Sequence, residues 1–75
     1  MNSNQYVQPD LTGLKQIVYQ STGIPLGEIV DDTEFVSADL GDRTDEVLRT
    51  CSARFGKSPE GGPQNFGQLR KQYGV

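Results

Sequence analysis

The sequence predicts an all-α fold, a small bundle of three to four helices. Three segments carry apolar residues at helical spacing, glycines and prolines lie mostly between these segments, and no segment alternates apolar and polar residues convincingly. The separate amphipathic faces must be buried against each other, which favours a bundle. The 75 residues are enough for one domain, expected over residues 10–75, and residues 1–9 are expected to form a flexible N-terminal segment.

The first helix is expected over residues 11–22. Asp10 is a good N-cap, Leu14 and Val18 lie on one helical face, and Gly23 ends the helix. The connection that follows contains Pro25, which forbids a long helix at that point, so residues 24–41 are interpreted as a packed loop.

The second helix is expected to follow Asp42 as its cap and to stop at Gly56, and a short third helix is expected to follow Asn65. Residues 57–64 are rich in glycine and proline, which predicts a flexible connection. The apolar positions predict one contiguous core, made of Leu14, Val18, Ile29, Phe35, Leu40, Val47, Leu48, Cys51, Phe55, Phe66 and Leu69.

Charge is distributed unevenly along the chain, although the formal net charge is only −3. Residues 28–46 hold eight carboxylates and a single base, Arg43, whereas residues 47–75 hold five bases and a single acid, Glu60. The sequence is therefore electrically polarised, with an acidic middle and a basic C-terminal part.

Residue types that carry catalysis and metal binding are scarce. Histidine is absent and Cys51 is the only cysteine, which leaves no Ser-His or Cys-His nucleophile and no internal disulfide. The apolar Phe35 breaks the ligand spacing of a calcium loop among the nearby carboxylates. We expect no enzymatic activity and no metal site.

The same composition bears on partners and compartment. The pI of about 4.6 argues against nucleic-acid binding, and no apolar stretch is long enough to span a bilayer. The polar N-terminus lacks the pattern of a signal peptide. The expectation is a cytoplasmic, monomeric protein that binds neither membranes nor nucleic acids.

The order of several short motifs resembles that of the acyl carrier proteins. They are Gly23-Ile24-Pro25, Glu28-Ile29, Asp31-Asp32-Thr33, Phe35, Asp39-Leu40-Gly41, Asp45, Val47, Phe55-Gly56 and Asn65-Phe66-Gly67-Gln68-Leu69. The resemblance runs from about Leu11 to Tyr73 and implies a four-helix domain. It also implies a phosphopantetheine arm on a serine that follows Asp39-Leu40-Gly41.

This chain lacks that serine. Aligned on Asp39-Leu40-Gly41 and Asp45, the position holds Arg43, which has no hydroxyl to accept a phosphoryl group. The neighbouring Thr44 has a hydroxyl but is displaced by one helical position. We therefore expect no phosphopantetheine attachment and no other cofactor.

The resemblance also implies an acidic docking surface at the start of the second helix. In this chain it corresponds to Asp39, Asp42, Asp45 and Glu46, with Arg43 among them. The expected partner is a protein with a basic patch, and synthase and transferase enzymes are candidates.

Two other functions stay open at the level of sequence. One is a working carrier of acyl or peptidyl groups in fatty acid, polyketide or related synthesis, modified at a non-standard hydroxyl. The other is a small helical adaptor unrelated to carriers.

Overall fold

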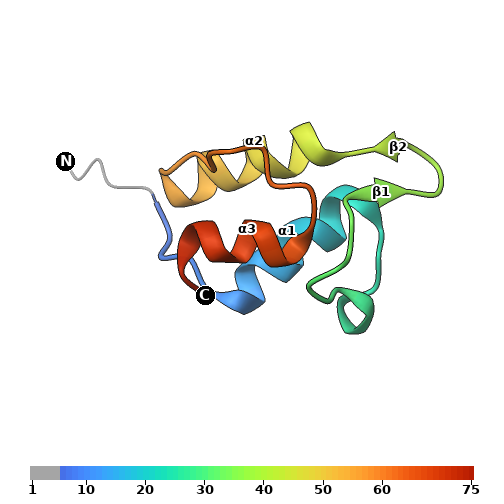
Figure 1. The fold of residues 1–75 in the computed structure, drawn as a ribbon, viewed down its shortest axis with the longest axis horizontal. Helices are drawn as coiled ribbons and strands as arrows, with labels where there is room; N and C mark the ends of the chain where they lie inside the picture. The colour runs from blue at the N-terminus through green and yellow to red at the C-terminus, as the bar shows by residue number, and fades with distance from the viewer. Residues whose placement is uncertain (1–5) are drawn as a thin grey trace.

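The computed structural model describes residues 6–75, which form three α-helices and a short antiparallel sheet (Figure 1). The elements are, in order, α1 (Leu11–Thr22), a 3₁₀ turn η1 (Leu26–Glu28), β1 (Val36–Ser37), β2 (Gly41–Asp42), α2 (Thr44–Phe55) and α3 (Phe66–Tyr73). Of the segment expected to be flexible, residues 1–5 lie outside the described residues. Within the remainder, the Val7 N–H donates to the Arg54 carbonyl, 2.9 Å away.

The prediction of an all-α fold is wrong, because the connection between α1 and α2 contains a β-hairpin. The two strands pair antiparallel, with Val36 opposite Asp42 and Ser37 opposite Gly41. An isolated bridge also joins Glu34 to residue 65, just before α3. The molecule is therefore a mixture of helices and a small sheet. Strands of two residues are too short to display the alternation by which a strand is recognised in a sequence.

Local hydrogen bonds shape the turn of this hairpin. The Ser37 hydroxyl accepts the backbone N–H groups of Asp39 and Leu40, at 3.2 and 3.1 Å. Gly41 then adopts a φ of +77°, a conformation that side chains disfavour. At the base of the hairpin the Arg43 N–H donates to the carbonyl of residue 35 at 2.7 Å, and α2 begins at the next residue.

Leu40 lies in the turn of the hairpin, and its predicted place in the core is wrong. Its side chain is 65% exposed, whereas Phe35, its expected fellow anchor, is fully buried. A turn that reverses the chain beyond the core places its residues in solvent, which explains the difference.

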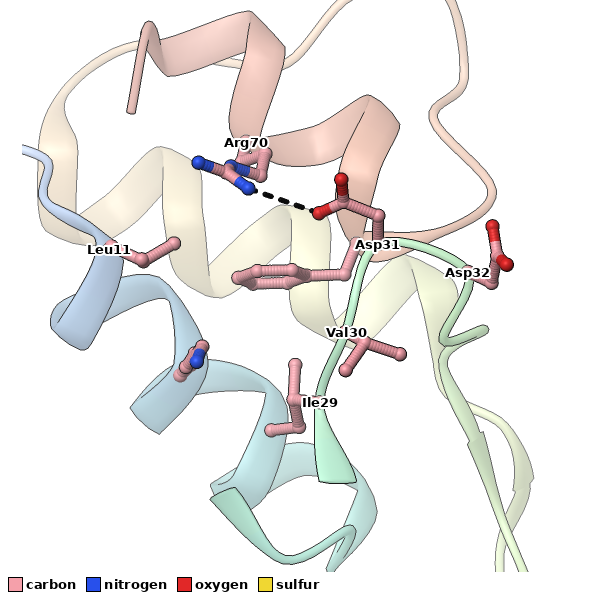
Figure 2. A pocket seen from close by; sticks show the side chains of 8 residues that line it. Leu11, Ile29, Val30, Asp31, Asp32 and Arg70 are labelled. Carbon is pink, nitrogen blue, oxygen red and sulfur yellow. Dashed lines mark hydrogen bonds and ion pairs between the residues drawn. The ribbon is translucent and has the colours of Figure 1, made fainter. Parts of the chain in front are cut away.

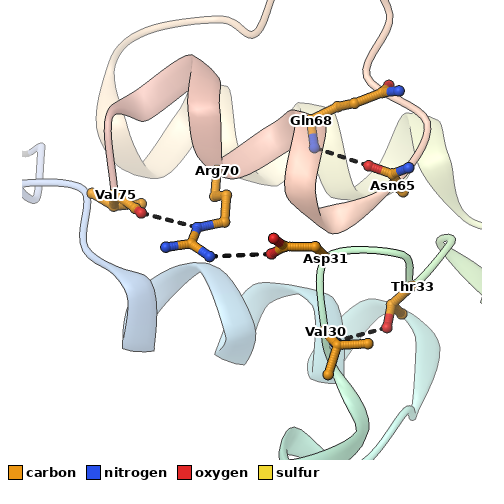
Figure 3. Close-up of polar contacts among 7 residues, drawn as sticks. All are labelled: Val30, Asp31, Thr33, Asn65, Gln68, Arg70 and Val75. Carbon is orange, nitrogen blue, oxygen red and sulfur yellow. Dashed lines mark hydrogen bonds and ion pairs between the residues drawn. The ribbon is translucent and has the colours of Figure 1, made fainter.

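The predicted caps of α1 and α3 are confirmed. The Asp10 carboxylate accepts the Gly13 N–H at 2.6 Å, and the Asn65 side chain accepts the Gln68 N–H at 2.9 Å (Figure 3). The stop at Gly23 is confirmed as well, because this glycine ends α1 in the left-handed conformation. Gly56 ends α2 in the same way.

One cluster of buried side chains forms the core, largely as predicted. Leu48 is only partly buried against it, and Ile17 of α1 belongs to it in addition. The Phe55 and Tyr73 rings pack edge to face with their centroids 5.1 Å apart, which joins α2 to α3. The buried members are Leu14, Ile17, Val18, Ile29, Phe35, Val47, Cys51, Phe55, Phe66 and Leu69.

The start of α3 is fixed to the connection between α1 and α2 by backbone hydrogen bonds. The Phe66 N–H donates to the Thr33 carbonyl and the Gly67 N–H to the Asp31 carbonyl, both at 2.8 Å. A Cβ atom at Gly67 would lie 2.9 Å from the Asp31 Cβ and 3.0 Å from its carbonyl oxygen. Glycine is therefore required at this close approach of two backbones.

Residues 57–64, predicted to be a flexible connection, are tied to α3 at several points. The Gln72 amide donates to the Glu60 carbonyl at 2.7 Å and accepts the Glu60 N–H at 3.1 Å. The Tyr73 hydroxyl donates to the Lys57 carbonyl at 2.6 Å, and Pro63 is buried. Side chains of α3 thus supply order that the glycine-rich and proline-rich composition did not indicate.

Candidate docking surface

Four carboxylates of the predicted docking surface lie at the hairpin end of the molecule, and we call them the acidic face: Asp39, Asp42, Asp45 and Glu46. Asp39 belongs to the hairpin turn, Asp42 to β2, and the other two to the first turn of α2. Because β2 leads into α2 after a single residue, the hairpin and the start of the helix occupy the same end (Figure 1). The helix dipole favours carboxylates in that first turn.

The acidic face has little compensating positive charge. Within the described part of the chain, only Glu46 forms an ion pair, with Arg49 one helical turn later at 3.2 Å. Both side chains are solvent-accessible, so this pair contributes at most about 1 kcal/mol. Asp39 and Asp45 are exposed and form no ion pair or side-chain hydrogen bond among residues 6–75. Their charges are available to a partner.

Asp42 has a local structural task in addition to its charge. Its carboxylate accepts the Thr44 hydroxyl at 2.6 Å and the Thr44 N–H at 2.8 Å. These two hydrogen bonds, the hydroxyl first, lower the pKa of Asp42 below its ordinary value and keep the group ionised. Thr44 is adjacent in sequence to Arg43, which occupies the position of the attachment serine, and its hydroxyl already donates a hydrogen bond to Asp42.

Arg43, predicted among the docking residues, is half-buried and partly engaged with the fold. Its Nε donates to the Ser21 carbonyl at 3.1 Å, and its backbone N–H bonds to Phe35. Ser21 lies in the last turn of α1, where the helix dipole favours a cation and where no other basic residue is found. The arginine thus links the end of α1 to the start of α2, and within the described residues it forms no ion pair with the acidic face.

A groove of about 410 Å³ lies beside the acidic face, between the start of α2 and residues 62–64. Apolar residues and carboxylates both line it, and Val36 is 50% exposed there. No local pattern identifies the groove in the sequence, because residues 62–64 reach it only through the tertiary fold. Its apolar residues are Phe35, Val36, Leu48 and Pro63, and its carboxylates are Glu34, Asp42 and Asp45.

Cys51, the only cysteine of the sequence, is fully buried. Burial raises the pKa of its thiol to about 12, so the reactive thiolate is not formed at neutral pH. Among residues 6–75 no group of three or more His, Cys, Asp or Glu side chains is arranged to hold a metal ion. None of the helices in this range has the length and apolar character needed to cross a membrane.

Comparison with known proteins leaves the chain without a significant match among family models, curated proteins and solved structures. Its function is therefore inferred from its own residues.

Proposed function

We propose that this chain is a relative of the acyl carrier proteins that docks to a basic partner protein through the acidic face and carries no phosphopantetheine arm. The observation behind the proposal is the charge pattern of the hairpin end. Asp39 and Asp45 stand without ion pairs within the described residues, and Arg43 is turned to the Ser21 carbonyl. Such a surface attracts a basic partner and speeds the encounter.

The groove beside the acidic face supports docking in a second way. Exposed Val36 and partly buried Leu48 offer apolar area next to the carboxylates, and Leu40 exposes further apolar area on the hairpin turn. Protein interfaces combine an apolar centre with a polar rim. The preferred partner segment is therefore basic and also partly apolar.

Charge reversal tests the docking surface. Asp39→Lys with Asp45→Lys removes two exposed carboxylates that have no structural hydrogen bond, so the fold is expected to survive. At low salt the association rate with a partner captured from the native host should fall by about tenfold or more, and the effect should shrink as salt screens the charges.

The matched control is Glu28→Lys with Glu60→Lys, which changes the net charge equally with exposed side chains outside the acidic face. It should leave most of the association rate intact. Equal losses in the two double variants would show a response to overall charge and refute docking through the acidic face.

The absence of an arm is tested by intact mass after incubation with a broad-specificity phosphopantetheinyl transferase and coenzyme A. The wild-type chain should gain no mass. Arg43→Ser restores the hydroxyl that the resemblance calls for and should gain one arm, although it also loses the hydrogen bond to Ser21. Modification of the wild type that disappears in Thr44→Ala would instead support a working carrier that uses a non-standard hydroxyl.

A further inference from the structure

A second cavity, of about 460 Å³, lies between α1 and α3, and no residue of the acidic face lines it (Figure 2). Helix α1 contributes Leu11 and Lys15, α3 contributes Phe66 and Arg70, and residues 29–32 form the remaining wall. The hydrogen bonds from Phe66 and Gly67 to Thr33 and Asp31 join two of these walls, α3 and the connection between α1 and α2.

Apolar side chains make up much of this cavity. Ile29 and Phe66 are almost completely buried, whereas Leu11 is 36% exposed and Val30 is 57% exposed. Leu11 and Val30 lie on opposite sides of the cavity (Figure 2). Covering two such side chains removes apolar area from water, which favours binding of an apolar group between them.

Two cations from different helices border the apolar part. The Arg70 guanidinium is held between its Nε bond to the Val75 carbonyl at 2.9 Å and its Nη1 bond to Asp31 at 3.1 Å (Figure 3). The Lys15 ammonium forms no hydrogen bond or ion pair among residues 6–75. Lys15 thus adds a positive charge that the fold does not use.

Two carboxylates also line the cavity, and only one of them is in an ion pair among residues 6–75. Asp31 is paired with Arg70, while the Asp32 side chain points away from both Arg70 and Leu11 (Figure 2). Within the described part of the chain, two unpaired charges of opposite sign are left, Lys15 on α1 and Asp32 on the side away from Leu11 (Figure 2). The complement of Lys15 is an anion next to an apolar group.

We propose that this cavity is a second docking surface, which binds an acidic segment of a partner protein. One aliphatic or aromatic side chain of the segment sits between Leu11 and Val30, and a neighbouring carboxylate pairs with Lys15. The half-exposed rim makes a shallow seat for an anchoring side chain and lacks the enclosure typical of small-molecule sites. The chain then offers two surfaces with opposite charge preferences.

A defined peptide tests the proposal without knowledge of the natural partner. The probe is acetylated and amidated Gly-Glu-Leu-Phe-Glu-Gly, titrated into the full chain while backbone amide chemical shifts are recorded. Shifts are expected in residues 11–15, 29–32 and 66–70. The same peptide with lysine in place of both glutamates should bind the cavity at least about tenfold more weakly, because Lys15 repels it.

Matched variants separate the cavity from general charge and hydrophobicity. Lys15→Glu should raise the dissociation constant about tenfold, whereas Lys71→Glu, an exposed lysine on α3 outside the cavity, should change it little. Val30→Ser should weaken binding, whereas Val36→Ser on the hairpin should not. All four positions are at least partly exposed, so the variants are expected to fold, and the thermal midpoint checks this.

Shifts centred on the hairpin, equal binding of the lysine peptide, or equal effects of Lys15→Glu and Lys71→Glu would overturn the proposal. Asp39→Lys with Asp45→Lys should not alter binding of the acidic peptide to the cavity, so the two docking surfaces are tested independently.

Discussion

Aspartate serves opposite purposes in the two regions proposed as docking surfaces. In the cavity between α1 and α3, Asp31 pairs with Arg70, and its carbonyl accepts the Gly67 N–H. On the acidic face, Asp39 and Asp45 are exposed and form no ion pair within the described residues. The Asp31 carboxylate is engaged in an ion pair within the fold, whereas those of Asp39 and Asp45 are left to solvent or to a partner. Asp42 stands between these extremes, since its exposed carboxylate also accepts the N–H of Thr44, the first residue of α2. Its predicted place as the N-cap of α2 is wrong, because Arg43 occupies that position.

The largest expected difference between the two regions is in the free energy of unfolding after one large side chain of each is truncated to alanine. Phe66→Ala removes a buried ring from the cavity and the core and should lower the free energy of unfolding by about 3 to 5 kcal/mol. Leu40→Ala removes an exposed side chain from the hairpin turn and should change it by less than about 0.5 kcal/mol. Urea unfolding measures both. A large loss in Leu40→Ala would contradict the exposed position of that residue.

A smaller effect is expected where the two backbones meet. In Gly67→Ala the added methyl group crowds Asp31, so α3 must shift, and the free energy of unfolding should fall by about 1 to 3 kcal/mol. Gly27→Ala is the control, because its Cβ would meet no atom within 4 Å. If the two alanine variants were equally stable in urea, the close contact at Gly67 would not constrain the fold.

The buried thiol should make the fold sensitive to alkali. Because burial raises the pKa of Cys51 from 9.0 to about 12, the unfolded chain releases this proton first, and stability falls as the pH rises from about 9 to about 12. We expect a loss of about 1 kcal/mol between pH 9 and 10. Tyr73, with its pKa also raised to about 12 by burial, acts in the same direction above pH 10. In Cys51→Ala the decline between pH 9 and 10 should flatten, and an unchanged decline would rule out the thiol as its cause.

The smallest expected effect concerns Asp42. Thr44→Val removes the hydroxyl that chiefly lowers the pKa of this carboxyl, so the pKa should rise toward its ordinary value in an NMR titration. The hydrogen bonds of Asp42 stabilise the fold above pH 3.8, and that contribution is lost as the pH falls through the lowered value. Thr50→Val, farther along α2, should leave the titration unchanged. A pKa that does not move in Thr44→Val would remove the hydroxyl as the cause.

Helix ends were predictable because their signals are local. Asp10 and Asn65 accept hydrogen bonds from residues three positions later, and Gly23 terminates its helix through its own backbone conformation. The hairpin was not predictable in this way. Its pairing depends on the Ser37 hydroxyl and on the bond from Arg43 to Phe35, neither of which produces a periodic pattern.

The two docking surfaces differ in the same respect. The residues of the acidic face lie close together in the sequence, so they are predictable from the distribution of charged residues alone. Lys15 and Arg70 are far apart in the chain, and they border one cavity because α1 and α3 pack around the same core. Arg43 lies among the residues of the acidic face in the sequence, but the charge pattern does not predict that its guanidinium bonds to the end of α1.

The Gln72 side chain, with its pair of hydrogen bonds to Glu60, has a consequence for local opening. Unwinding the end of α3 removes both bonds and also the one from Tyr73 to Lys57, so residues 57–64 lose these restraints together with the helix. Loop and helix should therefore open as one cooperative unit. In native-state hydrogen exchange, the Glu60 amide should be protected to the same degree as the amides of the last turn of α3, despite its place in a glycine-rich and proline-rich loop.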